Sequence, residues 1–137
     1  MFFNKEKKNE KVNFLVKICA LLVHAAKIDE NYSIIEEEII KKTLLQLGLK
    51  KENLLSTLNE AKILEENSNQ ILDFTREVKN LSDEEKLKIV EALWSIIYSN
   101  KDADLYETNL MRRLAGLLYI DSKTMGDAKD KIKKENL

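Results

Sequence analysis

Apolar residues recur every three or four positions along most of the chain, the spacing of helices with one face in a core. The first stripe passes through Val12, Leu15, Val16, Cys19, Leu22, Val23 and Ala26. The second passes through Ile35, Ile39, Thr43 and Leu47, and the third through Leu54, Leu55, Leu58 and Ala61. A short fourth helix is predicted through Ile71, Phe74, Thr75, Val78 and Leu81. No segment alternates with period two, so the predicted fold class is all-α.

The second half of the chain predicts three more helices. The stretch from Leu87 to Tyr98 is apolar around most of its circumference, which predicts the central buried helix, with Trp94 in the core. A sixth helix is predicted to bury Leu105, Leu110, Leu114, Leu117 and Leu118. A final helix should begin near Asp121 and pack through Met125, Ala128 and Ile132.

Helix starts are marked by a capping residue followed three positions later by a glutamate. Ser33 precedes Glu36 in this way, Ser82 precedes Glu85, and Asp104 precedes Glu107. Gly48 is expected to end the second helix, because glycine readily takes the left-handed conformation found after a helix C-terminus.

The chain contains an internal repeat. When Glu36 is aligned with Glu107, the offset in sequence number is 107 − 36 = 71, and Ile39 falls on Leu110. Two units, each a helix, an acidic turn and a second helix, therefore organise the chain. We expect one compact bundle of about seven helices with pseudo-twofold symmetry. Residues 1–10 should form a frayed, charged N-terminus and residues 11–137 the domain.

Composition narrows the class of protein. The 23 basic and 24 acidic residues are interleaved and give a net charge of −1, which argues against nucleic acid as a partner. One cysteine excludes an intramolecular disulfide, and no apolar run reaches the roughly 18 to 20 residues needed to span a bilayer. We therefore expect a cytoplasmic protein. Phe2 and Phe3, beside Lys5, Lys7 and Lys8, leave peripheral contact with a membrane surface open.

Three blocks of sequence resemble the tellurite-resistance protein B-like (TerB-like) family. The first is Ala20-Leu-Leu-Val with Lys-Ile-Asp29 and Glu36-Glu-Glu; the second is Phe74-Thr-Arg-Glu-Val with the stretch from Leu81 to Trp94. The third is Asp104-Leu-Tyr-Glu107 with the stretch from Leu110 to Leu118. The resemblance covers roughly residues 12 to 130. It implies a seven-helix domain with an acidic turn in each half, which is proposed in the family to hold a metal. It also implies a link to stress and tellurite resistance, to membrane-associated complexes and to fusion with signalling or chaperone domains.

The acidic turns depart from the family pattern. The carboxylates that could serve as metal ligands are Asp29, Glu36, Asp102, Asp104 and Glu107. The Asp-Gly of the family is replaced by Asp29-Glu30 in one turn and by Asn100-Lys101 in the other. Loss of both glycines, together with the cationic Lys101, predicts at most a weakly bound divalent cation. The alternative is that Ser33–Glu36 and Asp104–Glu107 act only as helix caps.

Enzyme chemistry has little support in this sequence. His24 is the only histidine, and it lies beside the core stripe, which favours a packed, hydrogen-bonded side chain over a catalytic base. Cys19 lies among apolar residues, which is typical of an inert core thiol. The predicted function is therefore a non-enzymatic, TerB-like interaction or stress-response module that acts through protein partners. A divalent-metal sensor that uses the acidic turns is the alternative, and an unrecognised enzyme is a remote one.

Overall fold

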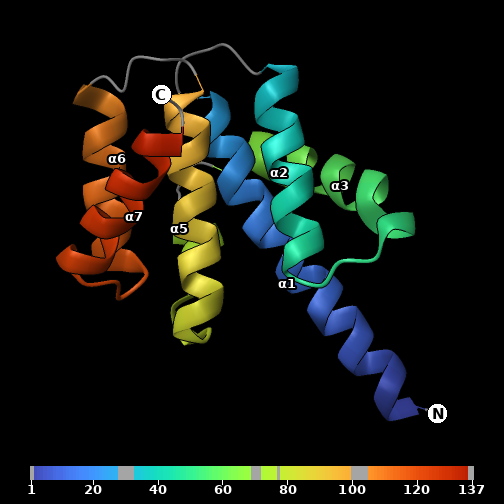
Figure 1. Ribbon diagram of the computed structural model, residues 1–137. Coiled ribbons are helices and arrows are strands. Elements are labelled where there is room, and N and C mark those ends of the chain that lie inside the picture. The colour runs from blue at the N-terminus through green and yellow to red at the C-terminus, as the bar shows by residue number, and fades with distance from the viewer. Residues whose placement is uncertain (1, 28–32, 69–71, 77, 100–104, 136–137) are drawn as a thin grey trace.

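A computed structural model describes residues 2–27, 33–68, 72–76, 78–99 and 105–135; within these ranges, the side chains of residues 2–12, 72 and 105–108 are not described. The described residues form seven α-helices and two short 3₁₀ turns, with no strand among them (Figure 1). The helices are α1 (Phe2–Lys27), α2 (Ile34–Gln46), α3 (Leu54–Glu66), α4 (Leu72–Thr75), α5 (Asp83–Tyr98), α6 (Leu105–Leu117) and α7 (Ser122–Glu135). The 3₁₀ turns are η1 (Lys51–Asn53) and η2 (Val78–Asn80). The predicted all-α bundle is confirmed.

The helix boundaries repeat with the offset predicted from the sequence. Helix α1 ends at Lys27 and α5 ends at Tyr98, which reproduces that offset (98 − 27 = 71). Helices α2 and α6 are related by the same offset at both their first and their last residues. The second helix of the first unit, and the segment that precedes it, are thus matched in length by those of the second unit, whereas α1 is longer than α5.

The C-terminal caps of α2 and α6 repeat in the same register. Gly48 follows α2 with a φ of 101°, and Tyr119, at the equivalent position of the repeat, has a φ of 55°. In both caps the next N–H donates to the carbonyl five positions earlier, at 3.0 Å after α2 and 2.9 Å after α6. These are the bonds of a Schellman cap, for which glycine is the favoured residue. Gly48 was predicted from the sequence; Tyr119, a non-glycine residue in this conformation, was not.

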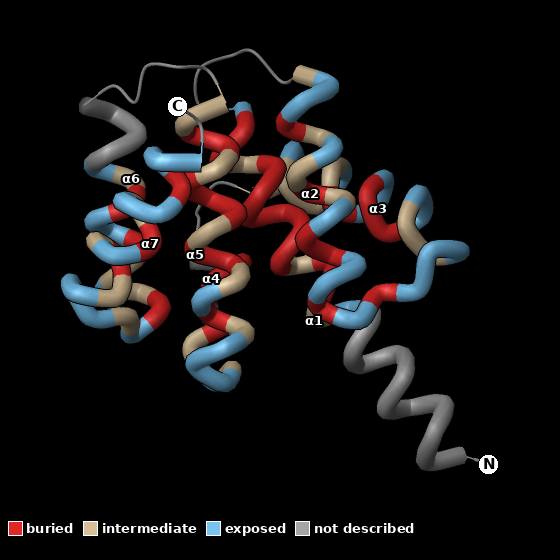
Figure 2. Tube along the Cα trace, in the orientation of Figure 1, coloured by how far each residue is buried: buried red, intermediate tan, exposed pale blue. Residues whose placement is uncertain are grey.

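The core is built around α1 and α5, which pack against each other. Figure 2 shows that buried residues continue along most of α5 and along the C-terminal half of α1. Each buried residue of α1 between Leu15 and Ala26 has its equivalent, at the same offset, in α5 between Lys86 and Ile97. Most of these equivalent residues of α5 are also buried, and Leu87, which is partly exposed, is the main exception. Helix α3 covers α1, and α2 and α7 both cover α5. The prediction of a buried central helix is confirmed, with Trp94 only 4% exposed.

One predicted helix face was partly wrong. Thr43 and Leu47 are buried as predicted, but Ile35 was expected in the core and is 62% exposed, and Ile39 is only half buried. Besides Thr43, the buried face of α2 contains Glu36, Ile40 and Leu44. Both faces have helical spacing, but Ile40, Leu44 and Leu47 form the apolar stripe that can be buried together. Glu36 can be buried at the start of this face because its carboxylate accepts a hydrogen bond in the capping box.

Other packing predictions were partly wrong. Leu55 is 66% exposed on α3, because the buried face of that helix passes through Thr57, Leu58 and Ala61. The fourth helix has only four residues before η2, although Phe74, Thr75 and Val78 are buried as expected. Met111 is buried on α6 and was missed; Leu114 and Leu118 are confirmed, Leu110 and Leu117 are half buried, and the side chain of Leu105 lies outside the described part of the chain. The last helix packs through Met125, Ala128 and Ile132 as predicted.

The boundary between frayed N-terminus and domain stays a prediction. Helix α1 begins at Phe2, ahead of the boundary expected near residue 11, and its N-terminal part extends away from the bundle (Figure 1). The side chains of residues 2–12 are not described, so Phe2, Phe3 and the neighbouring lysines lie outside the part on which packing can be judged.

Candidate functional site

The helix ends that flank the two acidic turns lie at one end of the bundle. In Figure 1, the C-terminal ends of α1 and α5 and the N-terminal ends of α2 and α6 all reach the same side of the molecule. Of the five predicted metal ligands, Asp29, Asp102 and Asp104 lie outside the described residues, and so does the side chain of Glu107. Glu36 is therefore the only member of the predicted set whose position can be examined.

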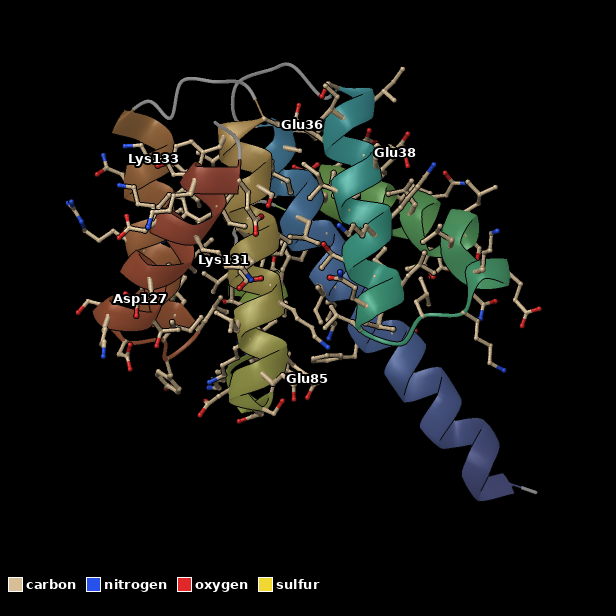
Figure 3. All side chains as sticks on the ribbon, in the orientation of Figure 1. Glu36, Glu38, Glu85, Asp127, Lys131 and Lys133 are labelled. Carbon is tan, nitrogen blue, oxygen red and sulfur yellow. The ribbon has the colours of Figure 1, made fainter. Side chains whose placement is uncertain are left out.

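Glu36 is a fully buried carboxylate in the first turn of α2. Its Oε1 accepts a hydrogen bond from the backbone N–H of Ser33 at 3.1 Å, and the Glu36 N–H donates to Ser33 Oγ at 3.2 Å. This is the reciprocal capping box predicted from the sequence. Figure 3 shows Glu36 on the side of α2 that faces α1 and α5, whereas Glu38 lies on the opposite side.

The position of Glu36 has a clear electrostatic cause. A buried carboxylate is costly unless hydrogen bonds and nearby positive charge compensate its lost hydration. The N-terminal end of α2 supplies a positive helix dipole, and the Ser33 N–H supplies a direct donor. A cation bound by both oxygens of Glu36 would compete with this capping bond. The one described member of the ligand set thus has a structural role already.

His24 joins α1 to α3 close to the first acidic turn. Its Nδ1 lies 3.3 Å from Glu65 Oε1, and Lys27 Nζ lies 2.8 Å from Glu65 Oε2. One carboxylate of α3 therefore holds two basic residues from the last turns of α1. His24 is hydrogen-bonded as predicted, and its side chain is 37% exposed rather than fully packed.

Cys19 lies in the middle of α1 and is fully buried. Burial raises the pKa of its thiol to about 12, and the charges of Lys62 and Glu37 have smaller, opposing effects. The thiolate is the reactive form of cysteine, and it is scarcely populated near neutral pH at such a pKa. Cys19 is therefore a core side chain, as predicted.

Trp94 and Tyr98 stack on α5, with ring centroids 6.0 Å apart and planes 27° apart. Lys129 of α7 places its Nζ 5.4 Å from the centre of the Trp94 ring, a contact that the sequence did not reveal. Burial, followed by the charge of Asp130, raises the pKa of Tyr98. This group is a packing contact between α5 and α7.

Large apolar side chains are exposed on α2 and α3. Ile34 is 79% exposed and Ile35 is 62% exposed at the start of α2; Leu55 is 66% exposed and Ile63 is 58% exposed on α3. We call these four residues the α2–α3 apolar residues. The two helices pack together and are joined by an ion pair between Glu37 and Lys62 at 3.0 Å. The exposure of Ile35 and Leu55 was not predicted from the sequence, because both residues lie at helical spacing from other apolar residues, as residues of a buried face would.

Comparison with known proteins identifies one family. The family model described as "Tellurite resistance protein TerB" matches residues 15–130. No match was found among curated proteins or among solved structures. The described helices include none that is long and apolar enough to cross a membrane. Within the same residues, no three His, Cys, Asp or Glu side chains are grouped as a metal site would require.

Proposed function

The chain belongs to the TerB family of tellurite resistance proteins, and from that premise we propose that it is a non-enzymatic interaction module of a stress response, acting through protein partners. The observation that carries the proposal is the exposure of the four α2–α3 apolar residues. Isolated apolar side chains are common on protein surfaces, whereas a contiguous apolar patch marks an interaction site, and we propose that these four residues belong to one such patch. We place this activity in the cytoplasm.

A protein partner is favoured by the size and chemistry of these side chains. Complete burial of one isoleucine or leucine contributes about 1.5–3 kcal/mol. Four such residues on adjoining helices could therefore supply much of the affinity of a transient complex, after the cost of association is subtracted. The Glu37–Lys62 pair between the two helices would add polar contacts to the same surface. The partner expected here is a protein that presents an apolar patch of its own.

The experiment is site-specific photo-crosslinking in the native cell. A crosslinking residue at Leu55 should capture a defined protein, which mass spectrometry identifies, whereas one at exposed Lys133 on α7 should not. The purified partner should then bind the wild-type chain and lose at least about tenfold in affinity when Ile35 and Leu55 are both changed to serine. Leu87→Ser, at a partly exposed apolar position of α5, is the matched control. Equal binding by the double variant and the control would refute the α2–α3 surface.

A second copy of the chain is one alternative occupant of this surface. Sedimentation at increasing concentration measures self-association directly. A dimer dissociated by the same double variant would assign the surface to self-association and contradict a separate partner.

The alternative function is a divalent-metal sensor that uses Asp29, Glu36, Asp102, Asp104 and Glu107. Its support is that the helix ends flanking both acidic turns meet at one end of the bundle. Against a tight site stand the missing glycines, Lys101 and the capping role of Glu36. Any calcium or magnesium affinity should therefore be near the millimolar end of known sites.

Calorimetric titration with calcium, magnesium, manganese and zinc separates the two functions. Millimolar or weaker binding is expected, with no change in fold when chelator is added. Micromolar binding that is lost on Asp104→Asn or Asp29→Asn would favour the sensor. An enzyme is the remote alternative, and the structural roles of Cys19 and His24 weaken it further.

A further inference from the structure

Helix α4 lies between the two repeated units and belongs to neither of them. It packs against α1 and α6, and Phe74, Thr75 and Val78, in α4 and the following η2, are buried. The internal repeat relates α1 to α5 and α6 to α2. The position related to that of α4 is therefore beside α5 and α2.

A cavity lies beside α5 and α2. Helices α2 and α7 both pack against α5, one on each side of it in Figure 1, and a cavity of about 260 Å³ remains between the three. We call it the α2–α5–α7 groove. Its walls carry one lysine from each helix: Lys42 from α2, Lys88 from α5 and Lys131 from α7.

The groove differs in chemistry from the related positions in the other half. Four of its residues are more polar or smaller than their counterparts in the repeat: Thr43 for Leu114, Gln46 for Leu117, Glu91 for Ala20 and Ala92 for Leu21. An apolar segment such as α4 would leave these polar groups without hydration, which is unfavourable. The smaller side chains leave space, and the polar ones favour a polar ligand.

The side chains that line the groove include more positive than negative charges. Lys131 Nζ lies 3.1 Å from Glu91 Oε1, and Figure 3 shows Lys131 between α7 and α5. The hydrogen bond and charge of Glu91 raise the pKa of Lys131, and Glu135 contributes a smaller effect in the same direction. These three residues bring two negative charges and one positive charge to the α7 side. The other two charged residues that line the groove are Lys42 and Lys88.

Lys42 and Lys88 are placed to hold one ligand together. Lys88 Nζ lies 3.5 Å from the backbone oxygen of Gln46, at the limit of a hydrogen bond. Gln46 follows Lys42 by four positions, so the two lie on one face of α2, about 6 Å apart along its axis. Among the described residues, no carboxylate is within ion-pair distance of either lysine. Both lysines thus line the groove without a carboxylate partner among the described residues.

We propose that the α2–α5–α7 groove binds a small oxyanion, a phosphate or carboxylate group, between Lys42 and Lys88. Two ammonium groups can donate charge-assisted hydrogen bonds to such a group. The volume of the groove suits a small molecule rather than a protein segment. The site lies on other residues than the α2–α3 apolar residues and is independent of the proposed interaction with a protein.

Calorimetric titration and ¹H–¹⁵N correlation spectra of the complete chain test the proposal. The probes are inorganic phosphate and succinate, added near neutral pH with total ionic strength held constant by sodium chloride, because exposed charges are screened by salt. Binding should shift the amide signals of Thr43, Ala92 and Ser95, which line the groove. Binding of phosphate alone or of succinate alone would support the site and identify the group it prefers.

Charge variants assign the binding to the two lysines. The double variant Lys42→Gln, Lys88→Gln should bind at least about tenfold more weakly, since hydrogen bonds to charged groups are among the stronger ones. Lys133→Gln, which removes the same kind of exposed charge from α7 outside the groove, should bind as the wild type does. Glu91→Gln removes a competing carboxylate and should strengthen binding severalfold.

Two results would overturn the assignment. One is that neither phosphate nor succinate shifts the amide signals of the groove at concentrations up to about 50 mM, which corresponds to negligible affinity. The other is equal binding by the double variant and by Lys133→Gln, which would place the anion elsewhere. The amide shifts are measured on the wild-type chain, so the test does not depend on the folding of any variant.

Discussion

Replacement of Trp94 by alanine tests the helical core directly. The side chain is 4% exposed, and its ring stacks on Tyr98 and lies 5.4 Å from the ammonium group of Lys129. An aromatic side chain of this kind buries roughly 150–250 Å², which at about 25 cal/mol per Å² corresponds to roughly 4–6 kcal/mol as an upper estimate. Measured Trp→Ala changes in protein cores cost about 3–5 kcal/mol. We therefore expect a loss of about 3–5 kcal/mol in the free energy of unfolding.

Urea unfolding followed by circular dichroism measures this loss without using tryptophan fluorescence. For a chain of this length, the same change should lower the Tm by about 10–17 °C. Trp94→Phe is the matched control: it keeps an aromatic ring in the core. The indole Nε1 has no hydrogen-bond partner among the described residues, so phenylalanine removes no observed bond. The control should cost less than half as much as alanine.

A loss of less than about 1 kcal/mol for Trp94→Ala, the typical effect of an ordinary substitution, would refute this account of the core. Such a result would mean that Trp94 is not part of a tightly packed contact between α5 and α7. A large and equal loss for alanine and phenylalanine would also contradict it, because it would assign the effect to the indole N–H rather than to packing.

Single residues outside this contact give three more tests. Ser33→Ala should cost about 1 kcal/mol of unfolding free energy by removing the α2 cap, and the loss should be the same with and without chelator; a loss abolished by chelator would indicate a metal. Both Gly48 and Tyr119 have a positive φ, which glycine adopts more easily than other residues. Gly48→Ala should therefore lower the free energy of unfolding by about 1 kcal/mol or more, and Tyr119→Gly should raise it by up to about 1 kcal/mol. Thermal melts in which both variants change stability in the same direction would contradict this. Cys19 should resist thiol reagents in the native state. The pKa of the Cys19 thiol is about 12 in the folded state, which is higher than in the unfolded state. Its contribution to the free energy of unfolding is therefore complete below a pH of about 9 and is lost as the pH rises toward 12, by up to about 1.4 kcal/mol per pH unit. A Cys19→Ala variant that loses stability equally at alkaline pH would refute this contribution.

The sequence by itself determined the repeat and most of the helices. The offset between the two halves was visible because the same apolar spacing and the same capping residues occur twice, and the boundaries of α2 and α6 repeat at that offset. The Ser33–Glu36 box and Gly48 could also be predicted, since caps depend on residues close in the chain. Family membership rests on the same local patterns and on the match over residues 15–130.

Only the tertiary structure decided which face of each helix is buried and where space remains. Ile35 and Ile40 both belong to stripes with helical spacing, and the choice between them depends on how α2 lies against α5, which is set by contacts distant in sequence. The exposure of Leu55 has the same origin. The α2–α5–α7 groove could not be predicted either, because it exists only where α2 and α7 both pack against α5 without filling the space that all three helices border. Local spacing fixes which residues can share a face, and packing across the whole chain fixes which face is used.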